Sequence, residues 1–428
     1  MQLISTHASP SPRQSFGHFL AGIAGMALAA ALLAWEPAAL ATRWHPAALA
    51  AVHLCALGGL MPVMLGALFQ FVPVACGLSL PDAGRIEWLR LAALEAGAVI
   101  LATGFVQGRA DAIAAGGTLA LASLAWSAAR LLRALHAQPA STALPRAMRR
   151  AALALAMTLA LGGVLVGILR LGGELPFLAL VDWHAQWALA GWVGGLILAV
   201  AGVVVPMFHV TAPYPARWEQ LTRALPWLVF AAGAGSLAAQ RWLTTVAVAA
   251  LCALAAGFGV LSILRVRASR RGERDAFHYG WLGAGLFALL AGATGLAAQV
   301  AADPRWSVAF GVIALGGLGG ITITVMLYRI VPFLIWLHWQ RANRARARLP
   351  LLHQIVPARP QAWQLGTEAV AVGGLALGAF LPETVCLAAI LLFFSKSAQF
   401  FLVCRAIREF SARLRVLQAL PPRPRAAH

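Results

Sequence analysis

Long apolar segments separated by short polar loops dominate the chain. The segment 53–77 is apolar almost throughout, with a histidine at its start and a Val-Pro pair near its end. As a helix, the twenty residues from His53 to Pro73 would cover about 30 Å, the thickness of one hydrocarbon core. The pattern therefore predicts a helix that crosses a membrane.

This arrangement occurs three times. A second copy runs from His184 to Val205-Pro206, and a third from Phe310 to Val331-Pro332. The prolines at 73, 206 and 332 are 133 and then 126 residues apart. Self-similarity at a nearly fixed period indicates a repeated structural unit. We therefore expect three groups of four helices, in which equivalent helices run in the same direction.

The pattern predicts an all-α integral membrane fold of about 12 transmembrane helices. Residues 1–16 are expected to form a cytoplasmic N-terminal tail, 17–404 a single transmembrane domain, and 405–428 a basic cytoplasmic C-terminal tail. The predicted helices cover 17–40, 47–75, 88–108, 112–135, 150–171, 178–208, 224–240, 242–264, 277–300, 307–337, 361–381 and 383–404.

Composition supports a membrane protein. Hydrophobic residues make up 61% of the 428 residues and charged residues only 11%, which excludes an ordinary soluble domain. The net charge of +19 does not indicate nucleic-acid binding, because the arginines fall in short loops, among them Arg85, Arg90, Arg130 and Arg133. The alternation of arginine-rich and arginine-poor loops predicts that both termini lie in the cytoplasm. We therefore expect a multi-pass protein of the inner membrane, whose main partner is the lipid bilayer. No CxxC or CxxCH motif is present, so neither a zinc clip nor a covalent c-type haem is indicated.

The second predicted helix carries a motif of known type. It contains His53, then Met61-Pro62-Val63-Met64-Leu65-Gly66, then Val72-Pro73 and Gly77. In these residues the chain resembles subunit I of the haem-copper oxidases. It resembles even more closely the NnrS family, haem-and-copper membrane proteins of the nitric-oxide response, through His53, Gly58, Gly66, Val72-Pro73 and Gly77. The sixth helix matches in part, through His184, Gly191-Trp192 and Pro206, and the tenth mainly as repeat geometry.

The resemblance implies that the second, sixth and tenth helices lie innermost, and that the protein functions in nitric-oxide or respiratory redox physiology beside respiratory or denitrification proteins. The oxidase copper ligands are absent, however. Residues 307–325 contain no histidine, and neither the paired histidines nor the histidine-proline-glutamate ligand of the oxidases is present. We therefore expect no oxygen reduction and leave any other enzymatic activity open.

Two histidines are candidate haem ligands. His53 and His184 lie twenty and twenty-two residues before the prolines of two inner helices, so they reach similar depths. Two imidazoles that face each other in a helix bundle are the usual ligands of a b-type haem. If His184 is not a ligand, His53 would bind haem with one axial position open to a small gas. Alternatively, both histidines lie near the lipid headgroups.

A second layer of histidines lies closer to the arginine-rich loops. His209 and His338 follow the prolines of the sixth and tenth helices, and His278 lies at a similar level. Imidazoles suit copper, so this layer is a candidate site for copper or a second haem. In the alternative interpretation these are ordinary interfacial histidines.

Four ionisable residues fall inside apolar segments, where they are costly and often functional. Glu368 and Lys396 are expected to pair across the last two helices. Arg329 is a candidate partner of haem propionates, and Glu95 a candidate proton carrier. Two other functions are consistent with the sequence: a secondary transporter whose pathway is formed by the proline-broken helices, and an assembly factor that handles haem or copper.

Overall fold

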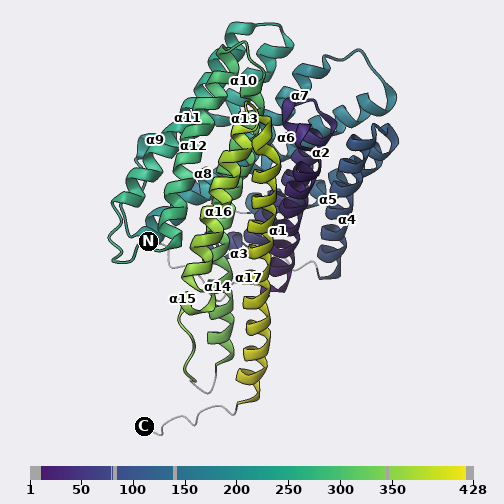
Figure 1. The fold of residues 1–428 in the computed structure, drawn as a ribbon. Helices are drawn as coiled ribbons and strands as arrows, with labels where there is room; N and C mark the ends of the chain where they lie inside the picture. Colours follow the sequence, from purple (N-terminus) through teal and green to yellow (C-terminus); the bar gives the residue numbers. More distant parts are fainter. Residues whose placement is uncertain (1–10, 79, 81–83, 138–141, 344–346, 421–428) are drawn as a thin grey trace.

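The structure, a computed structural model, describes residues 11–78, 80, 84–137, 142–343 and 347–420. These residues are almost entirely helical, and no strand occurs among them (Figure 1). Within the described ranges, ten helical segments are long and apolar enough to cross a membrane, so the chain is built as a multi-pass helical membrane protein. They cover Pro12–Trp35, Pro46–Cys76, Arg85–Gln107, Ala110–His136, Ala143–Leu171, Phe177–His209, Arg241–Arg267, Ala276–Val300, Arg305–Ala342 and Pro382–Ala419.

Six of these segments are mainly single α-helices: α1 (Pro12–Trp35), α4 (Arg85–Gln107), α5 (Ala110–His136), α6 (Ala143–Leu171), α11 (Arg241–Arg267) and α12 (Ala276–Val300). The last segment joins η6 (Pro382–Thr384) to α17 (Val385–Ala419). Helices also occur at the two other predicted positions, as α10 (Leu225–Leu237) and α16 (Ala358–Leu377). At 13 residues α10 is too short to span a bilayer in straight form, and α16 begins with polar residues. The total of twelve crossings stays a prediction. The short elements are η2 (Pro37–Ala41), α9 (Ala216–Thr222) and α15 (Leu352–Ile355).

Both predicted tails differ from the structure. Helix α1 begins at Pro12, inside the expected N-terminal tail, and α17 continues to Ala419 through most of the expected C-terminal tail. The continuation is stable because apolar residues recur at helical spacing, and Phe410 and Leu417 among them are buried. Helices α14 and α17 pack side by side and project beyond the others at the end where the C-terminus lies (Figure 1). Residues 1–10 and 421–428 of the predicted tails lie outside the described residues.

Some of the arginines that the sequence analysis assigned to loops lie inside helices in the structure. Arg90 lies inside α4 with only 5% of its surface exposed, and Arg130 and Arg133 lie inside α5. We call the end of the bundle that contains these residues and the C-terminal end of α17 the arginine-rich end.

The three Val-Pro segments share an interruption that the sequence pattern did not predict. Each contains a stretch of π-helix: η3 (Leu54–Leu60), η4 (Trp187–Gly194) and η5 (Ile313–Ile321). Each stretch begins 19 residues before the proline of its helix. The flanking helices are α2 (Pro46–His53) and α3 (Met61–Cys76), α7 (Phe177–Gln186) and α8 (Gly195–His209), and α13 (Arg305–Val312) and α14 (Thr322–Ala342). Because π-helix is rare and concentrates at functional sites, this register indicates a common structural role.

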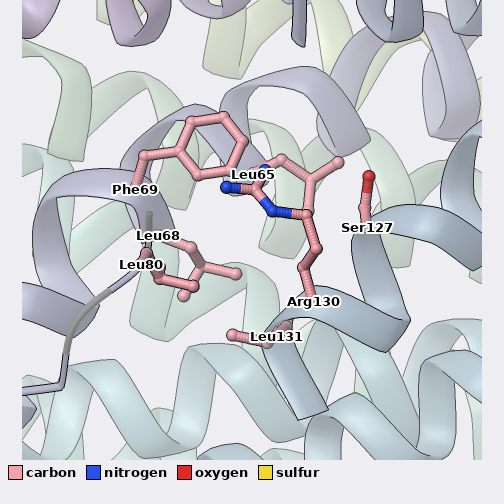
Figure 2. Close-up of a pocket in the computed structure, with 7 residues that line it drawn as sticks. All are labelled: Leu65, Leu68, Phe69, Leu80, Ser127, Arg130 and Leu131. Carbon is pink, nitrogen blue, oxygen red and sulfur yellow. The ribbon is translucent and has the colours of Figure 1, made fainter. Parts of the chain in front are cut away.

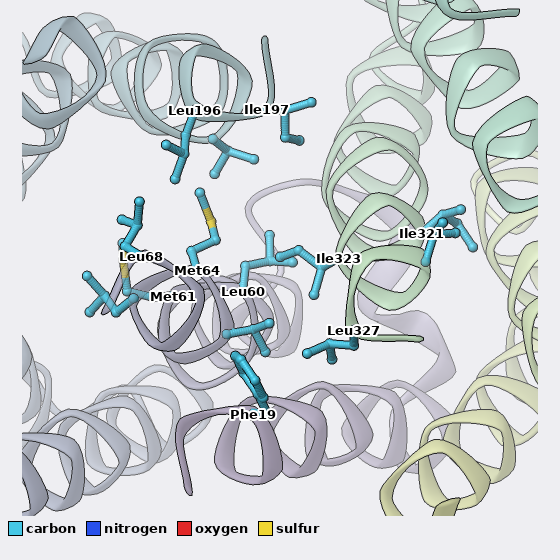
Figure 3. Packing of buried hydrophobic residues seen from close by; sticks show 14 of the residues in the cluster. Phe19, Leu60, Met61, Met64, Leu68, Leu196, Ile197, Ile321, Ile323 and Leu327 are labelled. Carbon is cyan, nitrogen blue, oxygen red and sulfur yellow. The ribbon is translucent and has the colours of Figure 1, made fainter. Parts of the chain in front are cut away.

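The π stretches meet in the interior, where η3 and η4 both pack against η5. Figure 3 shows Leu60 and Met64 between Leu196 of α8 and Ile323 of α14. Buried residues make up 67% and 72% of the apolar windows in the second and tenth predicted helices, but only 39% in the sixth. The second and tenth helices are therefore central, whereas the sixth is central mainly through its π stretch.

Candidate functional site

His53 is the last residue of α2, immediately before η3. Its Nδ1 lies 2.7 Å from the carbonyl oxygen of Leu49, and its ring packs against Phe105 of α4 with centroids 5.1 Å apart. A carbonyl oxygen can only accept, so Nδ1 carries the proton and donates. Nε2 is then left with a free lone pair, as a metal ligand requires.

His184 lies on α7 and has the same tautomer for a different reason. Its Nδ1 donates across helices to the carbonyl oxygen of Thr158 on α6, at 3.1 Å. A side chain at Gly162 would place its Cβ 3.2 Å from Cε1 of His184, so the glycine makes room for this ring. Packing between α6 and α7 thus fixes both the tautomer and the position of the imidazole.

His53 and His184 are both partly buried, and a charge on one would act on the other. That the two rings face each other across one site stays a prediction. Whether they bind haem stays a prediction.

Repeat register identifies a residue near this pair that the sequence reasoning missed. Gln186, like His53, lies twenty residues before its proline and directly precedes a π stretch. Its Oε1 is buried without a hydrogen-bond partner among the described residues, as are Nε1 of Trp187 and Nε1 of Trp192 in η4. Counting back from Pro206 would have identified Gln186. These three atoms indicate that a water or a ligand completes the interior at η4.

Glycines lie at an equivalent position in each π stretch. Gly58, Gly191 and Gly317 are all buried and lie fifteen residues before their prolines. A Cβ on Gly25 of α1 would clash with the carbonyl group of Gly58, which shows how closely those two backbones approach. Glycine here permits close packing of the two helices.

The inner histidines separate into different environments. His209, at the end of α8, stacks on Phe277 with centroids 5.2 Å apart and lies near His278, whereas His338 packs against Phe410. Nε2 of His209 is buried without a partner among the described residues. The described residues contain no group of three or more potential metal-ligating side chains. Whether His209 and His338 share a copper site stays a prediction.

Arg329 has a protein partner. It forms an ion pair with Asp275, the N-cap of α12, and its guanidinium lies 4.5 Å from the ring centroid of Phe277. Burial acts to raise the pKa of Asp275, but Arg329, the backbone N–H of His278 and Arg271 together lower that pKa below its ordinary value. Arg329 therefore needs no haem propionate for charge balance, and its predicted cofactor role stays a prediction.

The predicted pairing of Glu368 with Lys396 is confirmed. Nζ of Lys396 lies 2.5 Å from Oε1 of Glu368, and both residues are almost completely buried between α14, α16 and α17. Lys396 also donates to Thr324 at 2.8 Å. Gln364 donates to Oε2 of Glu368 at 2.9 Å, and Tyr328 donates to Gln364 at 2.8 Å. This network satisfies its charges within the protein.

A buried cluster at the arginine-rich end was missed entirely. Glu87, only 1% exposed, accepts from Nε of Arg90 at 2.6 Å and from Arg130 at 3.0 Å. His18 of α1, fully buried, lies with its Nε2 2.5 Å from Nη2 of Arg90. In the sequence these residues lie near helix ends, a position that is equally consistent with a solvent-exposed loop and with a buried helix. Only the packing of α1 against α4 and of α4 against α5 shows that they are buried together.

Comparison with known proteins adds no identification. No protein-family model matches the chain, and no curated protein matches it.

Proposed function

We propose that this chain is a haem-binding membrane protein of the haem-copper oxidase/NnrS type, in which His53 and His184 hold one b-type haem. The observation that supports this proposal most directly is that the Nδ1 atoms of both imidazoles are bonded to carbonyl oxygens. Both Nε2 atoms are therefore available as ligands in an apolar interior. Haem bound there would supply one-electron chemistry or gas binding.

The surroundings suit a planar, largely apolar group. Both imidazoles are only partly buried by protein atoms, so part of each ring is open to a ligand. Phe105 supplies an apolar face beside His53, and Gly162 leaves room for the ring of His184. Iron would give the two free Nε2 atoms the partner that burial demands.

The proposal includes a twelve-helix arrangement with threefold repeat, both termini in the cytoplasm and a location in the inner membrane. The common register of the three π stretches supports the repeat, and the arginine-rich end supports the orientation. A function in nitric-oxide or respiratory redox physiology follows from the family resemblance. His209 and His338 are the proposed ligands of copper in the inner layer.

The test is the reduced-minus-oxidised absorption spectrum of the purified protein and its variants. We expect b-type bands in the wild type, their loss in His53→Ala, and their loss or a change of spin state in His184→Ala. His136→Ala is a matched control, because His136 also donates from Nδ1 to a carbonyl four residues earlier but is exposed. Full haem content in both interior variants, with normal membrane insertion, would contradict the proposal.

A secondary transporter is the alternative that the three proline-broken helices favour. The π stretches and prolines weaken the regular hydrogen bonding of three helices at the same two levels, as a substrate pathway in the membrane requires. The absence of bound haem, combined with solute uptake into proteoliposomes, would favour this function over the first.

A further inference from the structure

Glu95 is an ionisable residue of the interior that the proposed haem site does not use. It lies on α4, and its Oε1 is buried without a hydrogen-bond partner among the described residues. A Cβ on Gly58 of η3 would lie 3.4 Å from the other oxygen, Oε2. A carboxylate in this position would be an uncompensated charge, so the neutral acid is the form that burial favours.

A polar connection leads from Glu95 toward the arginine-rich end. Arg90 lies five residues earlier on α4, about 7 to 8 Å along the axis. Arg90 contacts His18 and Glu87 directly. Polar groups thus recur along α4 from Glu95 to Glu87, although Glu95 and Arg90 lie about 140° apart around the helix.

His18 has the contacts of a proton relay. Its Nδ1 donates to the carbonyl oxygen of Gln14 at 2.8 Å. Its Nε2 has a donor within reach, Arg90 at 2.5 Å, and also an acceptor, Oε1 of Glu87 at 3.1 Å. The neutral ring accepts from Arg90 and the protonated ring donates to Glu87, so the same position suits both protonation states.

The cluster reaches the surface through Arg130. The side chain of Arg130 is 19% exposed and pairs with Glu87, which is only 1% exposed. Figure 2 shows Arg130 at a small pocket that Ser127 and Phe69 also line. The groups of this cluster that can pass a proton are Glu87 and His18, and the two arginines hold them in position.

We propose that Glu95 is a proton-binding site that exchanges its proton with the arginine-rich side through Glu87 and His18. Glu95 lies ten residues from Phe105, the residue that contacts His53, which places it about 15 Å along α4 from the histidine pair. The site does not depend on haem. Other interior titratable groups on the elements that pack against α4 are His18 of α1, His53 of α2, Cys55 of η3 and Arg130 of α5.

The first experiment detects the proton directly. The infrared spectrum of the purified wild type at neutral pH should contain the carbonyl stretch of a protonated carboxylic acid, and Glu95→Gln should lose it. This substitution keeps the shape of the side chain and removes no ion pair. Glu383→Gln is the control, because Glu383 is exposed and its removal should leave the band unchanged. A band that is unaltered in Glu95→Gln would overturn the proposal, whatever the haem content.

The second experiment tests the route. On transfer to D₂O the Glu95 band should shift as its proton exchanges, and His18→Gln should slow this shift by about tenfold or more, since the relay loses its proton-accepting nitrogen. His18→Phe is a second variant, which keeps a ring beside Phe69 if His18→Gln does not fold. Exchange at the wild-type rate in whichever variant folds would exclude His18 as the relay.

Discussion

The Lys396–Glu368 network and the His53–His184 pair are both buried polar systems, but they differ in how fully the protein satisfies them. Lys396 has three acceptors, Glu368, Thr324 and Gln399, and Glu368 receives donors at both oxygens. By contrast, His53 and His184 each make one hydrogen bond through Nδ1 and leave Nε2 free.

This difference suggests two roles for buried polar side chains in a membrane protein: some stabilise the packing of helices, and others bind a ligand. A network whose charges are all paired fixes the packing of its helices, here α14, α16 and α17. Its one open donor among the described residues is the amide nitrogen Nε2 of Gln399. By contrast, a pair of histidines with an unused acceptor nitrogen on each ring has the capacity to bind a ligand. The comparison can be tested by removing partners from each system in turn.

The largest effect is expected from Lys396→Met. It leaves the carboxylate of Glu368 buried without its cation, which should lower the free energy of unfolding by about 3–5 kcal/mol. The double variant Lys396→Met/Glu368→Gln should recover most of that loss, because no charge is then left unpaired. Thermal unfolding in detergent measures both. A double variant as unstable as the single one would show that the pair itself is the stabilising element.

An ion pair at the membrane edge should be less sensitive. Asp275→Asn removes the charge that faces Arg329 and Arg271 but keeps an N-cap acceptor for α12, so we expect a loss of about 1.5–3 kcal/mol at neutral pH. Because the folded pKa of Asp275 is lowered, its contribution is present above the unfolded pKa and is lost as pH falls through the folded pKa. Melting temperatures of wild type and variant should therefore converge only at acid pH. A gap that stays constant with pH would contradict this origin.

Filling the space beside His184 should separate binding from folding. Gly162→Val places a branched side chain against the imidazole, with a stability cost of about 1–3 kcal/mol and loss of haem. Gly167→Val, on the same helix, meets open space and should keep its haem. Haem content per protein, measured on folded material, is the readout. Equal haem content in the two variants would show that His184 is not a ligand.

The smallest effect is expected at the edge of the satisfied network. Tyr328→Phe removes one hydrogen bond to Gln364 and should cost about 1 kcal/mol without changing haem content. The measurement is thermal unfolding together with the absorption spectrum. A loss of haem in this variant would show that the two polar systems are coupled.

Periodicity and composition predicted most of the helical architecture. Long apolar runs have few stable alternatives to helices in a bilayer, and the three Val-Pro units were recognisable because the sequence itself repeats. The sequence was also sufficient to predict the Glu368–Lys396 pair, since two opposite charges in adjacent apolar helices have few other partners.

The tertiary structure decided which polar residues are buried and what they contact. Arg90 and Glu87 lie near a helix end in sequence, where exposure and burial are equally consistent, and only the packing of α1 and α5 around α4 distinguishes the two. The π stretches likewise depend on close approach between helices, as at Gly25 and Gly58. The tautomer of His184 is set by Thr158, 26 residues away in sequence, through an interhelical contact that no local pattern encodes.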